Sequence, residues 1–420
     1  MLNLSFKFIN DLKRKLFPFY KDKDLKVVFE KLQKGFSKET VVARFVGGCV
    51  RKHLNGKTID DIDIATILTS EEIKEKFQNT NYKIIETGIK HGTITLISEK
   101  LKLELTTLRK DVETDGRHAK VEYIDDWKLD SERRDFTINA IYLDKHGKIF
   151  DPQMGLIDLK NKNVKFIGDP QKRIEEDYLR IIRFLRFSIE YDSAADVTTI
   201  DALKINLNGI KKISKERILN ELFKILNLNN FENILKYQDK KLIFSIIFPE
   251  LMHLDRLQRL SEIKKYVKLD IKNLLAILLI DEKESHEYFF HKYKIPNDIK
   301  ENLNLLARNF KLLKNDKNYF NTNLEKNIYL YGKDHLEVLN ILNFLSDKKY
   351  IAQNFQKISV NISNSKNHKF PFNGEYLMQN GIKEGLVLGK VLKIIENEWL
   401  ENNFQISDKR IKEIIKRNLN

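Results

Sequence analysis

The chain has 420 residues, and 75 lysines and arginines stand against 60 aspartates and glutamates, which gives a formal net charge of +15. Hydrophobic residues make up 42% of the sequence and aromatic residues 10%, enough to build sizeable cores, so wholesale disorder is excluded. The single cysteine excludes a disulfide framework and a thiolate metal cluster, and it is typical of a reducing compartment.

The first predicted element is a helix over about residues 25–34, where apolar residues recur at helical spacing and Gly35 is placed to end it. Four later segments alternate apolar and polar residues, which predicts strands of a half-buried sheet. These strands are expected at residues 61–66, 92–97, 101–108 and 133–143.

From about Arg173 the pattern changes to long helical repeats of Leu, Ile and Phe among Lys, Glu and Asn. Glycine follows the same division, because ten of the 16 glycines lie between Gly35 and Gly168 and none lies between Gly209 and Gly332. The sequence therefore predicts an α+β fold, with the sheet in the N-terminal part and a mostly helical region after it.

Gly47 and Gly48 follow a predicted apolar strand. A Gly-Gly turn lets backbone N–H groups approach an anion closely, and a helix that begins there aims its positive end at the same point. Arg51 falls one turn into that helix, where it is placed for a phosphate. An ordinary tight turn is the alternative meaning of the pair.

Asp61 and Asp63 lie on the predicted strand 61–66. Residues i and i+2 of a strand point the same way, so both carboxylates share one face while the neighbouring isoleucines face the core. Parallel carboxylates repel each other unless they are protonated, hydrogen-bonded or bridged by a cation, and Mg²⁺ takes such oxygen ligands. For an isolated pair, a solvated strand face is the alternative interpretation. Asp60 points to the opposite face and is interpreted as structural or exposed to solvent.

Glu104 lies on the polar side of the predicted strand 101–108. If this strand lies beside the strand 61–66, the three carboxylates can hold two metal ions about 3.5–4 Å apart. Alone, Glu104 would be interpreted as an exposed strand residue.

Together these segments resemble the nucleotidyltransferase superfamily of the DNA polymerase β type, and within it the bacterial class II CCA-adding tRNA nucleotidyltransferases and poly(A) polymerases. The resemblance covers about residues 44–225, and five motifs appear in the order of the family. After motif A at Gly47–Asp63, the sequence is similar to a flexible loop at 110–118 and to motifs B, C, D and E at 132–140, 151–170, 176–186 and 214–222.

The resemblance implies a polymerase β-like palm domain with a mixed sheet in residues 1–165. A helical neck that recognises the base is implied for residues 166–230, and a helical body and tail that bind tRNA for residues 231–420. The implied reaction is attack of an RNA 3′-hydroxyl on the α-phosphate of a nucleoside triphosphate, with Asp61, Asp63 and Glu104 as ligands of two Mg²⁺ ions.

Motif B places Arg133 and Arg134 before a predicted strand, and their planar guanidinium groups pair well with phosphate oxygens. At least one of them is expected to face the triphosphate, with a salt bridge to Asp135 as the alternative for the other. Asn139 is expected to bind the triphosphate or the sugar.

Motif D predicts one helix face that carries Asp177, Arg180 and Arg183, with Arg186 one turn further, all four as nucleotide-binding residues. An Asp/Arg pair can match the Watson–Crick edge of cytosine or adenine, because each base offers an amine donor beside a ring-nitrogen acceptor. Guanine and uracil present the reverse pattern and would oppose the pair. The family assigns this choice of base to the positions of Asp177 and Arg180, and a surface salt bridge between them is the alternative.

The segment Asp111–His118 is polar and contains glycine, which predicts mobility. In the family this loop helps the site change from cytidine to adenosine addition. The residues of this sequence expected to act in the loop are Asp111, Asp115, Gly116 and Arg117.

The favoured function is addition of CCA to the tRNA 3′ end from CTP and ATP without a nucleic-acid template. The alternatives are a poly(A) polymerase, a CC-only or A-only enzyme and, from a different class, an inactive RNA-binding homologue. Poly(A) polymerases typically carry an extra Gly-Arg-Arg-Phe-Arg-like basic stretch, whereas residues 82–97 read YKIIETGIKHGTITLI. The intact carboxylates argue against the inactive homologue.

The expected partners are the acceptor end of tRNA and the two nucleotides, with lysines of the helical half supplying a salt-dependent affinity. No membrane partner is expected, because the longest apolar run, residues 274–280, is too short to span a bilayer. The N-terminal segment also lacks the apolar stretch of a secretion signal. We therefore expect a soluble, cytoplasmic protein, and the sequence leaves its oligomeric state open.

Overall fold

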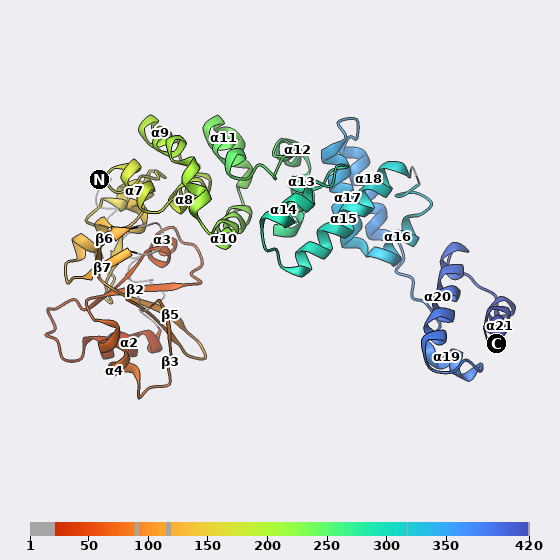
Figure 1. The fold of residues 1–420 in the computed structure, drawn as a ribbon, viewed down its shortest axis with the longest axis horizontal. Coiled ribbons are helices and arrows are strands. Elements are labelled where there is room, and N and C mark those ends of the chain that lie inside the picture. Colours follow the sequence, from red (N-terminus) through yellow and green to blue (C-terminus); the bar gives the residue numbers. More distant parts are fainter. Residues whose placement is uncertain (1–21, 89–91, 115–118, 317, 419–420) are drawn as a thin grey trace, which may run out of the picture. The chain divides into compact units, whose positions relative to one another are not determined.

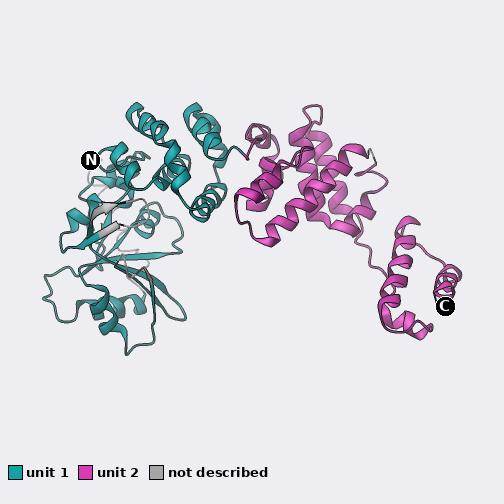
Figure 2. Ribbon diagram, in the orientation of Figure 1, with its two compact units in different colours: residues 1–249 teal, residues 250–420 magenta. Residues whose placement is uncertain are grey.

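The computed structural model describes residues 22–88, 92–114, 119–316 and 318–418. The chain forms two compact units, residues 1–249 and residues 250–420 (Figure 2). The first unit contains the sheets and the second is helical (Figure 1). The expected division into three domains, with boundaries after residues 165 and 230, stays a prediction.

A seven-stranded sheet forms the centre of the first unit, with strand order β3-β4-β5-β2-β1-β8-β9. Strands β2 and β5 pair in parallel and the other neighbours pair antiparallel, so the sheet is mixed, as predicted. The strands are β1 (Ala43–Val46), β2 (Ile62–Thr66), β3 (Lys83–Gly88), β4 (Thr93–Ile97), β5 (Lys102–Thr107), β8 (Tyr142–Leu143) and β9 (Ile149–Phe150).

One face of this sheet is apolar and packs against helices α2 (Lys23–Gln33) and α4 (Ser70–Phe77). The rings of Phe29 from α2 and Phe45 from β1 lie 4.8 Å apart. Helix α2 confirms the predicted helix, and Gly35 follows it with φ +93°, a conformation that favours glycine.

The opposite face carries Asp63 and Glu104, and beside them lies a small apolar cluster. Strand β5 alternates strictly around Glu104, since Leu103 and Leu105 are fully buried on the other side. The cluster consists of Val46, Ala65, Leu108 and Tyr142, with Trp127 packed against it. The two carboxylates, Asp63 and Glu104, therefore lie on one face of the sheet, opposite the apolar face that packs against α2 and α4.

The predicted strand over residues 133–143 is wrong for most of its length. Helix α5 (Trp127–Glu132) ends there, a 3₁₀ turn covers Thr137–Asn139, and only β8 joins the sheet. The backbone N–H of Thr137 donates to the carbonyl of Lys165 (3.1 Å) and its hydroxyl donates to Asp158 (2.8 Å). Tertiary contacts therefore override an alternating pattern that local propensity favours.

Strands β6 (Arg109–Thr114) and β7 (Ala119–Tyr123) form a separate two-stranded sheet. The predicted loop over Asp111–His118 is therefore too long, because Asp111 already pairs with Val121 in this sheet. Asp115, Gly116 and Arg117 lie outside the described residues.

Among the other helices of the first unit, α8 is central because its Ile181, Ile182 and Leu185 are fully buried, as predicted. It packs against α10, the helix of motif E. The helices are α3 (Gly48–Leu54), α6 (Gly155–Lys160), α7 (Pro170–Glu176), α8 (Leu179–Glu190), α9 (Val197–Ile205), α10 (Lys215–Leu226) and α11 (Gln238–Ile247).

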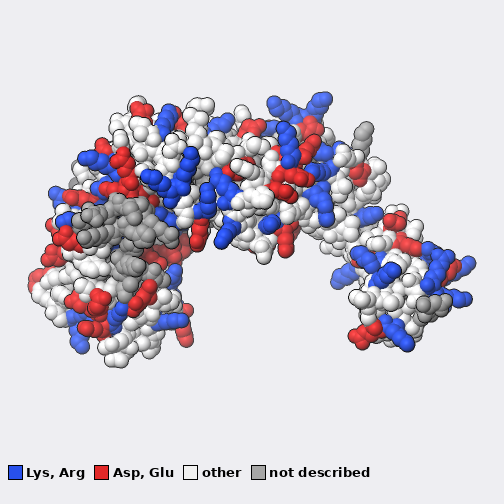
Figure 3. All heavy atoms as spheres, in the orientation of Figure 1, with Lys and Arg blue, Asp and Glu red and all other residues white. Residues whose placement is uncertain are grey.

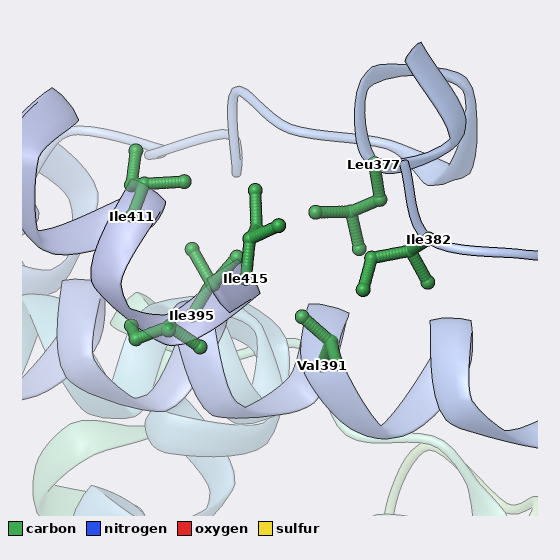
Figure 4. Packing of buried hydrophobic residues seen from close by; sticks show 7 residues of the cluster. Leu377, Ile382, Val391, Ile395, Ile411 and Ile415 are labelled. Carbon is green, nitrogen blue, oxygen red and sulfur yellow. The ribbon is translucent and has the colours of Figure 1, made fainter. Parts of the chain in front are cut away.

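The second unit is built from helices α12 (Arg256–Ile263), α13 (Ile271–Leu279), α14 (Ser285–Lys292), α15 (Asn297–Asn315), α16 (Leu324–Tyr331), α17 (Lys333–Ser346), α18 (Ala352–Asn364), α19 (Gly374–Gln379), α20 (Leu386–Glu401) and α21 (Asp408–Arg417). Its last three helices share an apolar core of Leu377, Ile382, Val391, Ile395, Ile411, Ile414 and Ile415 (Figure 4). The glycine-bearing tail thus has a core of its own.

Charged side chains of both signs are interspersed on the face shown in Figure 3, so the positive charge of the chain is not gathered in a single patch there. The longest apolar run of the sequence forms the buried part of α13. No helix in the described part of the chain is long and apolar enough to cross a membrane.

Candidate active site

The turn between β1 and α3 brings backbone close to a carboxylate. Gly47 has φ +74° and ψ −130°, a conformation that favours glycine, and a Cβ built on it would lie 3.5 Å from Oδ2 of Asp63. A Cβ built on Gly48 would meet nothing within 4 Å. The predicted strand, Gly-Gly turn and helix are confirmed, and the turn lies directly against the candidate metal ligand.

Asp63 and Glu104 occupy paired positions of the parallel strands β2 and β5, so their side chains leave the same face of the sheet. Burial, together with the negative charges of Glu104 and Asp61, raises the pKa of Asp63 to about 6, although Arg134 and Arg51 oppose the shift. The predicted neighbourhood of the two strands is confirmed. Asp61 precedes β2 and is exposed.

Asp60 points away from this group. Its carboxylate binds Nζ of Lys52 at 2.7 Å, and its side chain is 67% exposed. This agrees with the interpretation that it faces solvent.

Both arginines of motif B bind one buried carboxylate, Asp130, which the sequence analysis missed. Arg133 Nη2 lies 2.7 Å from Oδ1 and Arg134 Nη2 lies 3.0 Å from Oδ2. The hydroxyl of Tyr142 donates to the same Oδ2 at 2.7 Å. Burial opposes ionisation, but the two arginines hold the pKa of Asp130 well below its usual range. The available signal was an acidic residue three and four positions before two arginines, at the end of a helix.

The expected salt bridge from motif B to Asp135 is not the observed one, because Asp135 binds Arg183 of motif D, with Nε 2.7 Å from Oδ2. Asp135 also accepts from Nδ2 of Asn139 at 2.9 Å. The Oδ1 atom of Asn139 accepts from Arg51. Asn139 is therefore buried and links Arg51 to Asp135, and its expected contact with the triphosphate or the sugar stays a prediction.

Three guanidinium groups surround the ring of Phe187 on α8. Those of Arg51, Arg183 and Arg186 lie 4.5, 5.7 and 4.0 Å from its centroid. Glu221 from α10 is 3% exposed and accepts from Nε of Arg186 at 2.8 Å. The fold thus gathers three predicted nucleotide-binding arginines from motifs A and D around one aromatic ring.

Motif D is not one helix. Helix α7 ends at Glu176, Asp177 is extended (φ −154°, ψ 104°), and α8 begins at Leu179. Asp177 binds Arg217 of α10 at 2.7 Å, and Arg180 binds Glu176 at 2.5 Å. The alternative salt bridge between Asp177 and Arg180 is therefore replaced by two other pairs. The aspartate side chain accepts from the backbone N–H of Leu179, a local bond that favours a helix break.

The sequence and the fold of this chain are similar to those of known proteins. Residues 43–165 match the family model of the poly A polymerase head domain, and residues 196–254 match the model described as "Probable RNA and SrmB- binding site of polymerase A". CCA tRNA nucleotidyltransferase 1, mitochondrial, of Mus musculus is 32% identical over 408 residues, which cover 91% of this chain and 88% of that protein. The chain belongs to the family of CCA-adding enzymes and poly(A) polymerases.

Two further matches agree with this family. The CCA-adding enzyme of Ligilactobacillus salivarius is 30% identical over 378 residues, which cover 88% of this chain and 90% of that enzyme. The crystal structure of the Bacillus stearothermophilus CCA-adding enzyme in complex with CTP superposes with a TM-score of 0.66 over 93% of this chain and 96% of that chain, at 22% identity. At this low identity, the match to the crystal structure shows a similar fold and nothing more.

Nucleotidyltransferases of this family generally use a divalent metal ion. The charge of the site fits a cation, because Asp61 and Glu104 raise the pKa of Asp63 and a bound cation would relieve that repulsion. Among the residues that the structure describes, no group of three or more His, Cys, Asp or Glu side chains is arranged to hold a metal. The predicted triad is therefore present as an in-register pair and an exposed neighbour, not as a closed ligand set.

Motif C of the nucleotidyltransferase packs against the segment of motif B. The carboxylate of Asp151 accepts from the backbone N–H groups of Gly155 (2.8 Å) and Leu156 (2.9 Å), which starts α6. A Cβ on Gly155 would lie 2.1 Å from the carbonyl oxygen of Thr137, so only glycine fits there. The residues of motif C thus pack α6 closely against the 3₁₀ turn that carries Asn139.

Cys49 behaves as the predicted small packing residue. It is buried beside the candidate site, and its Sγ lies 3.2 Å from the carbonyl of Val46. Burial raises the pKa of the thiol to about 12, so it stays protonated at neutral pH.

In metal-free buffer, the contribution of Asp63 to the free energy of unfolding is expected to fall as the pH rises from 3.8 to about 6, because folding raises the pKa of this carboxyl from 3.8 to about 6. Over this window the folded protein retains a proton that the unfolded chain has lost, so each rise in pH disfavours folding. Urea unfolding of wild type and Asp63→Asn at about pH 4.5 and about pH 7 should show a pH-dependent difference of about 1–3 kcal/mol between the two proteins.

Addition of Mg²⁺ should stabilise the wild-type nucleotidyltransferase more at the higher pH, where Asp63 is ionised. A difference between wild type and Asp63→Asn that does not change with pH would contradict the electrostatic description of this site.

Proposed function

We propose that this chain is a CCA-adding tRNA nucleotidyltransferase, which builds the CCA end of tRNA from CTP and ATP without a template. The observation that carries the proposal is the in-register pair Asp63 and Glu104 beside the Gly47 turn, in a chain about one-third identical to named CCA-adding enzymes over most of its length. A bare RNA-binding role would not need paired carboxylates on the polar face of a sheet.

In the proposed reaction the 3′-oxygen of tRNA bonds to the α-phosphorus, the bond to the β-phosphate breaks and pyrophosphate leaves. Asp61, Asp63 and Glu104 are the proposed ligands of two Mg²⁺ ions, which would lower the pKa of the hydroxyl and neutralise charge on the triphosphate. The Gly47–Gly48 turn offers open backbone next to Asp63, where the triphosphate can approach.

The arginines supply the remaining positive charge. The side chain of Arg134 is 16% exposed, and its charge acts on Asp63, where it opposes the rise in the pKa of that carboxyl. Arg134 is therefore our choice for the motif B contact to the triphosphate. Arg183 and Arg186 are held at Phe187 with Arg51, and we assign them to the nucleotide as well. Arg134, Arg183 and Arg186 each pair with a buried carboxylate and Arg51 donates to Asn139, which fixes the guanidinium groups before the ligand arrives.

Asp177 and Arg180 are the proposed readers of the base edge. Asp177 accepts hydrogen bonds and Arg180 donates them, a combination that suits cytosine and adenine and opposes uracil and guanine. Arg180 donates to the carbonyls of Arg173 and Arg133 as well as to Glu176, so its orientation is fixed on three sides.

The helices of the second unit are the proposed tRNA-binding part, with phosphate contacts from their lysines. We propose the cytoplasm as the compartment, on the single cysteine. Three of the related enzymes are named as mitochondrial, so localisation of a tagged chain is the direct check.

The deciding experiment sequences product 3′ ends after incubation of tRNA that lacks its CCA end with Mg²⁺ and each nucleoside triphosphate, alone and mixed. A CCA-adding enzyme adds two cytidines with CTP alone and a complete CCA with both nucleotides. Long adenosine tails would identify a poly(A) polymerase. A product that stops at CC when both nucleotides are present would identify a CC-only enzyme. If no RNA is extended, the inactive RNA-binding homologue is the remaining alternative.

Replacing residues 115–118 by a short glycine-serine turn should spare addition of the two cytidines and impair addition of the final adenosine, because this segment belongs to the predicted switching loop. The measurement is the ratio of CC-ended to CCA-ended product in time courses with both nucleotides. An equal loss of C and A addition would show that the segment only supports the fold.

A further inference from the structure

The ring of Phe187 on α8 lies among three positive charges. Phe187 is 1% exposed, so its ring is shielded from water. The guanidinium carbons of Arg186 and Arg51 lie over this ring at 4.0 and 4.5 Å from its centroid, and that of Arg183 lies at 5.7 Å. Burial, together with the charges of Arg183 and Arg51, lowers the pKa of Arg186. Because like charges repel, the cluster needs negative charge nearby to stay together.

Arg51 is the member of this cluster that lacks a carboxylate. The other two guanidinium groups form ion pairs, which are Arg183–Asp135 and Arg186–Glu221. In the described part of the chain, Nη1 of Arg51 donates to the neutral side chain of Asn139, and its Nε is buried without a hydrogen-bond partner. The negative face of the Phe187 ring is therefore the group that lies directly over this guanidinium.

An aromatic ring and a carboxylate hold a guanidinium group in different ways. A carboxylate takes up N–H donors, whereas the face of a ring attracts the positive charge and leaves the donors in the guanidinium plane free. Arg51 thus keeps a buried Nε–H that an anion can use. The charge of Arg51 also acts on Asp63, so this donor lies near the proposed metal and triphosphate site.

We infer that Phe187 is a positioning residue for the triphosphate, because the face of its ring holds Arg51 and Arg186 together and leaves N–H donors of Arg51 for phosphate oxygens. The inference rests on that part of the proposed function which places a nucleoside triphosphate at these arginines. It adds an indirect role in nucleotide affinity for an uncharged, buried side chain. A weaker attraction between ring and cations should therefore weaken nucleotide binding without changing the choice of base.

The test changes the charge on the face of the ring at nearly constant shape. Phenylalanine with one, two or three ring fluorines is incorporated at position 187, since each fluorine withdraws electron density from the face of the ring. The Kd values for CTP and ATP are measured by isothermal titration calorimetry with Mg²⁺ and without tRNA. KM and kcat for CTP are measured on tRNA that lacks its CCA end.

Both Kd values and KM should rise by roughly twofold with each fluorine, and by roughly tenfold in Phe187→Leu, which keeps an apolar side chain without a π face. The ratio of the Kd values for CTP and ATP should stay constant, and so should kcat. A thermal melt of each protein shows whether it is folded, and the fluorine series decides the question if Phe187→Leu does not fold.

The same fluorine series at Phe184 is the matched control. Phe184 lies on the same helix, is fully buried and stacks on Phe166 with 5.6 Å between the ring centroids. Among the described residues, the cations that lie over an aromatic ring of α8 are at Phe187 and not at Phe184. Fluorines at Phe184 should therefore leave the Kd for CTP unchanged.

A Kd that stays flat across the Phe187 series would overturn the inference, and so would tighter binding with added fluorines or an equal trend at Phe184. A rise for only one of the two nucleotides would overturn it too, because it would show an effect on the base. If the wild-type chain binds CTP with the expected trend but extends no tRNA, the proposed function fails and the inference stands. If the wild-type chain binds neither CTP nor ATP, both fail.

Discussion

Replacing Asp63 by alanine should reduce incorporation of both CTP and ATP by roughly a thousandfold or more, while tRNA binding stays near the wild-type value. Asp63 is the carboxylate that lies in register with Glu104 and against the Gly47 turn, so its loss removes the central proposed metal ligand. The measurement is single-turnover incorporation of labelled CTP and ATP with saturating Mg²⁺, alongside a filter-binding titration of tRNA.

Asp60→Ala is the control for this variant. Asp60 lies three residues away, is exposed and binds only Lys52 among the described residues, so its loss should change the rate less than twofold. Asp61→Ala should resemble Asp63→Ala if Asp61 joins the ligand set when metal and nucleotide bind. Near wild-type turnover in Asp63→Ala would remove the catalytic assignment.

Replacing Asp130 by asparagine should lower the free energy of unfolding by about 3–5 kcal/mol, because it leaves two arginines without their buried counter-ion. Asp130 is completely buried and holds Arg133 and Arg134 on separate oxygens. The same change should weaken nucleotide binding, since Arg134 would lose the partner that aims it at the candidate site. Urea unfolding and the KM for CTP and ATP measure the two effects.

Tyr142→Phe provides the comparison for Asp130. It removes the hydroxyl that donates to Oδ2 of Asp130 and keeps the buried ring, so a cost of about 1 kcal/mol is expected. If Asp130→Asn were as stable as Tyr142→Phe, Asp130 would be one hydrogen-bond acceptor among several and not the anchor of motif B.

Local pattern in the sequence was sufficient for strands β2, β4 and β5 and for the turn of motif A, but not for the segment 133–143. Alternation on β5 placed Glu104 opposite two leucines, because strand geometry depends only on neighbouring residues, whereas Asp61 precedes β2 and is exposed. The Gly-Gly turn was predictable for the same reason. The prediction for Glu104 assumed that its strand lies beside the strand of Asp63, and the structure pairs the two strands in parallel with Asp63 opposite Glu104.

The partners of the charged residues were decided by the tertiary structure. Arg217 and Glu221 lie on α10, and sequence spacing does not show that Arg217 meets Asp177 or that Glu221 meets Arg186. These two pairs and the pair of Arg183 with Asp135 join residues 40, 35 and 48 positions apart.

Burial explains why these pairings are specific. A buried carboxylate is tolerated only where donors neutralise it, and which donors arrive depends on how α8 packs against α10 and against the segment that carries Phe136. The sequence by itself determined the fold class, the carboxylates and the order of the motifs, whereas only the packed chain decided which guanidinium group each carboxylate holds, because that choice is made by long-range burial and not by local geometry.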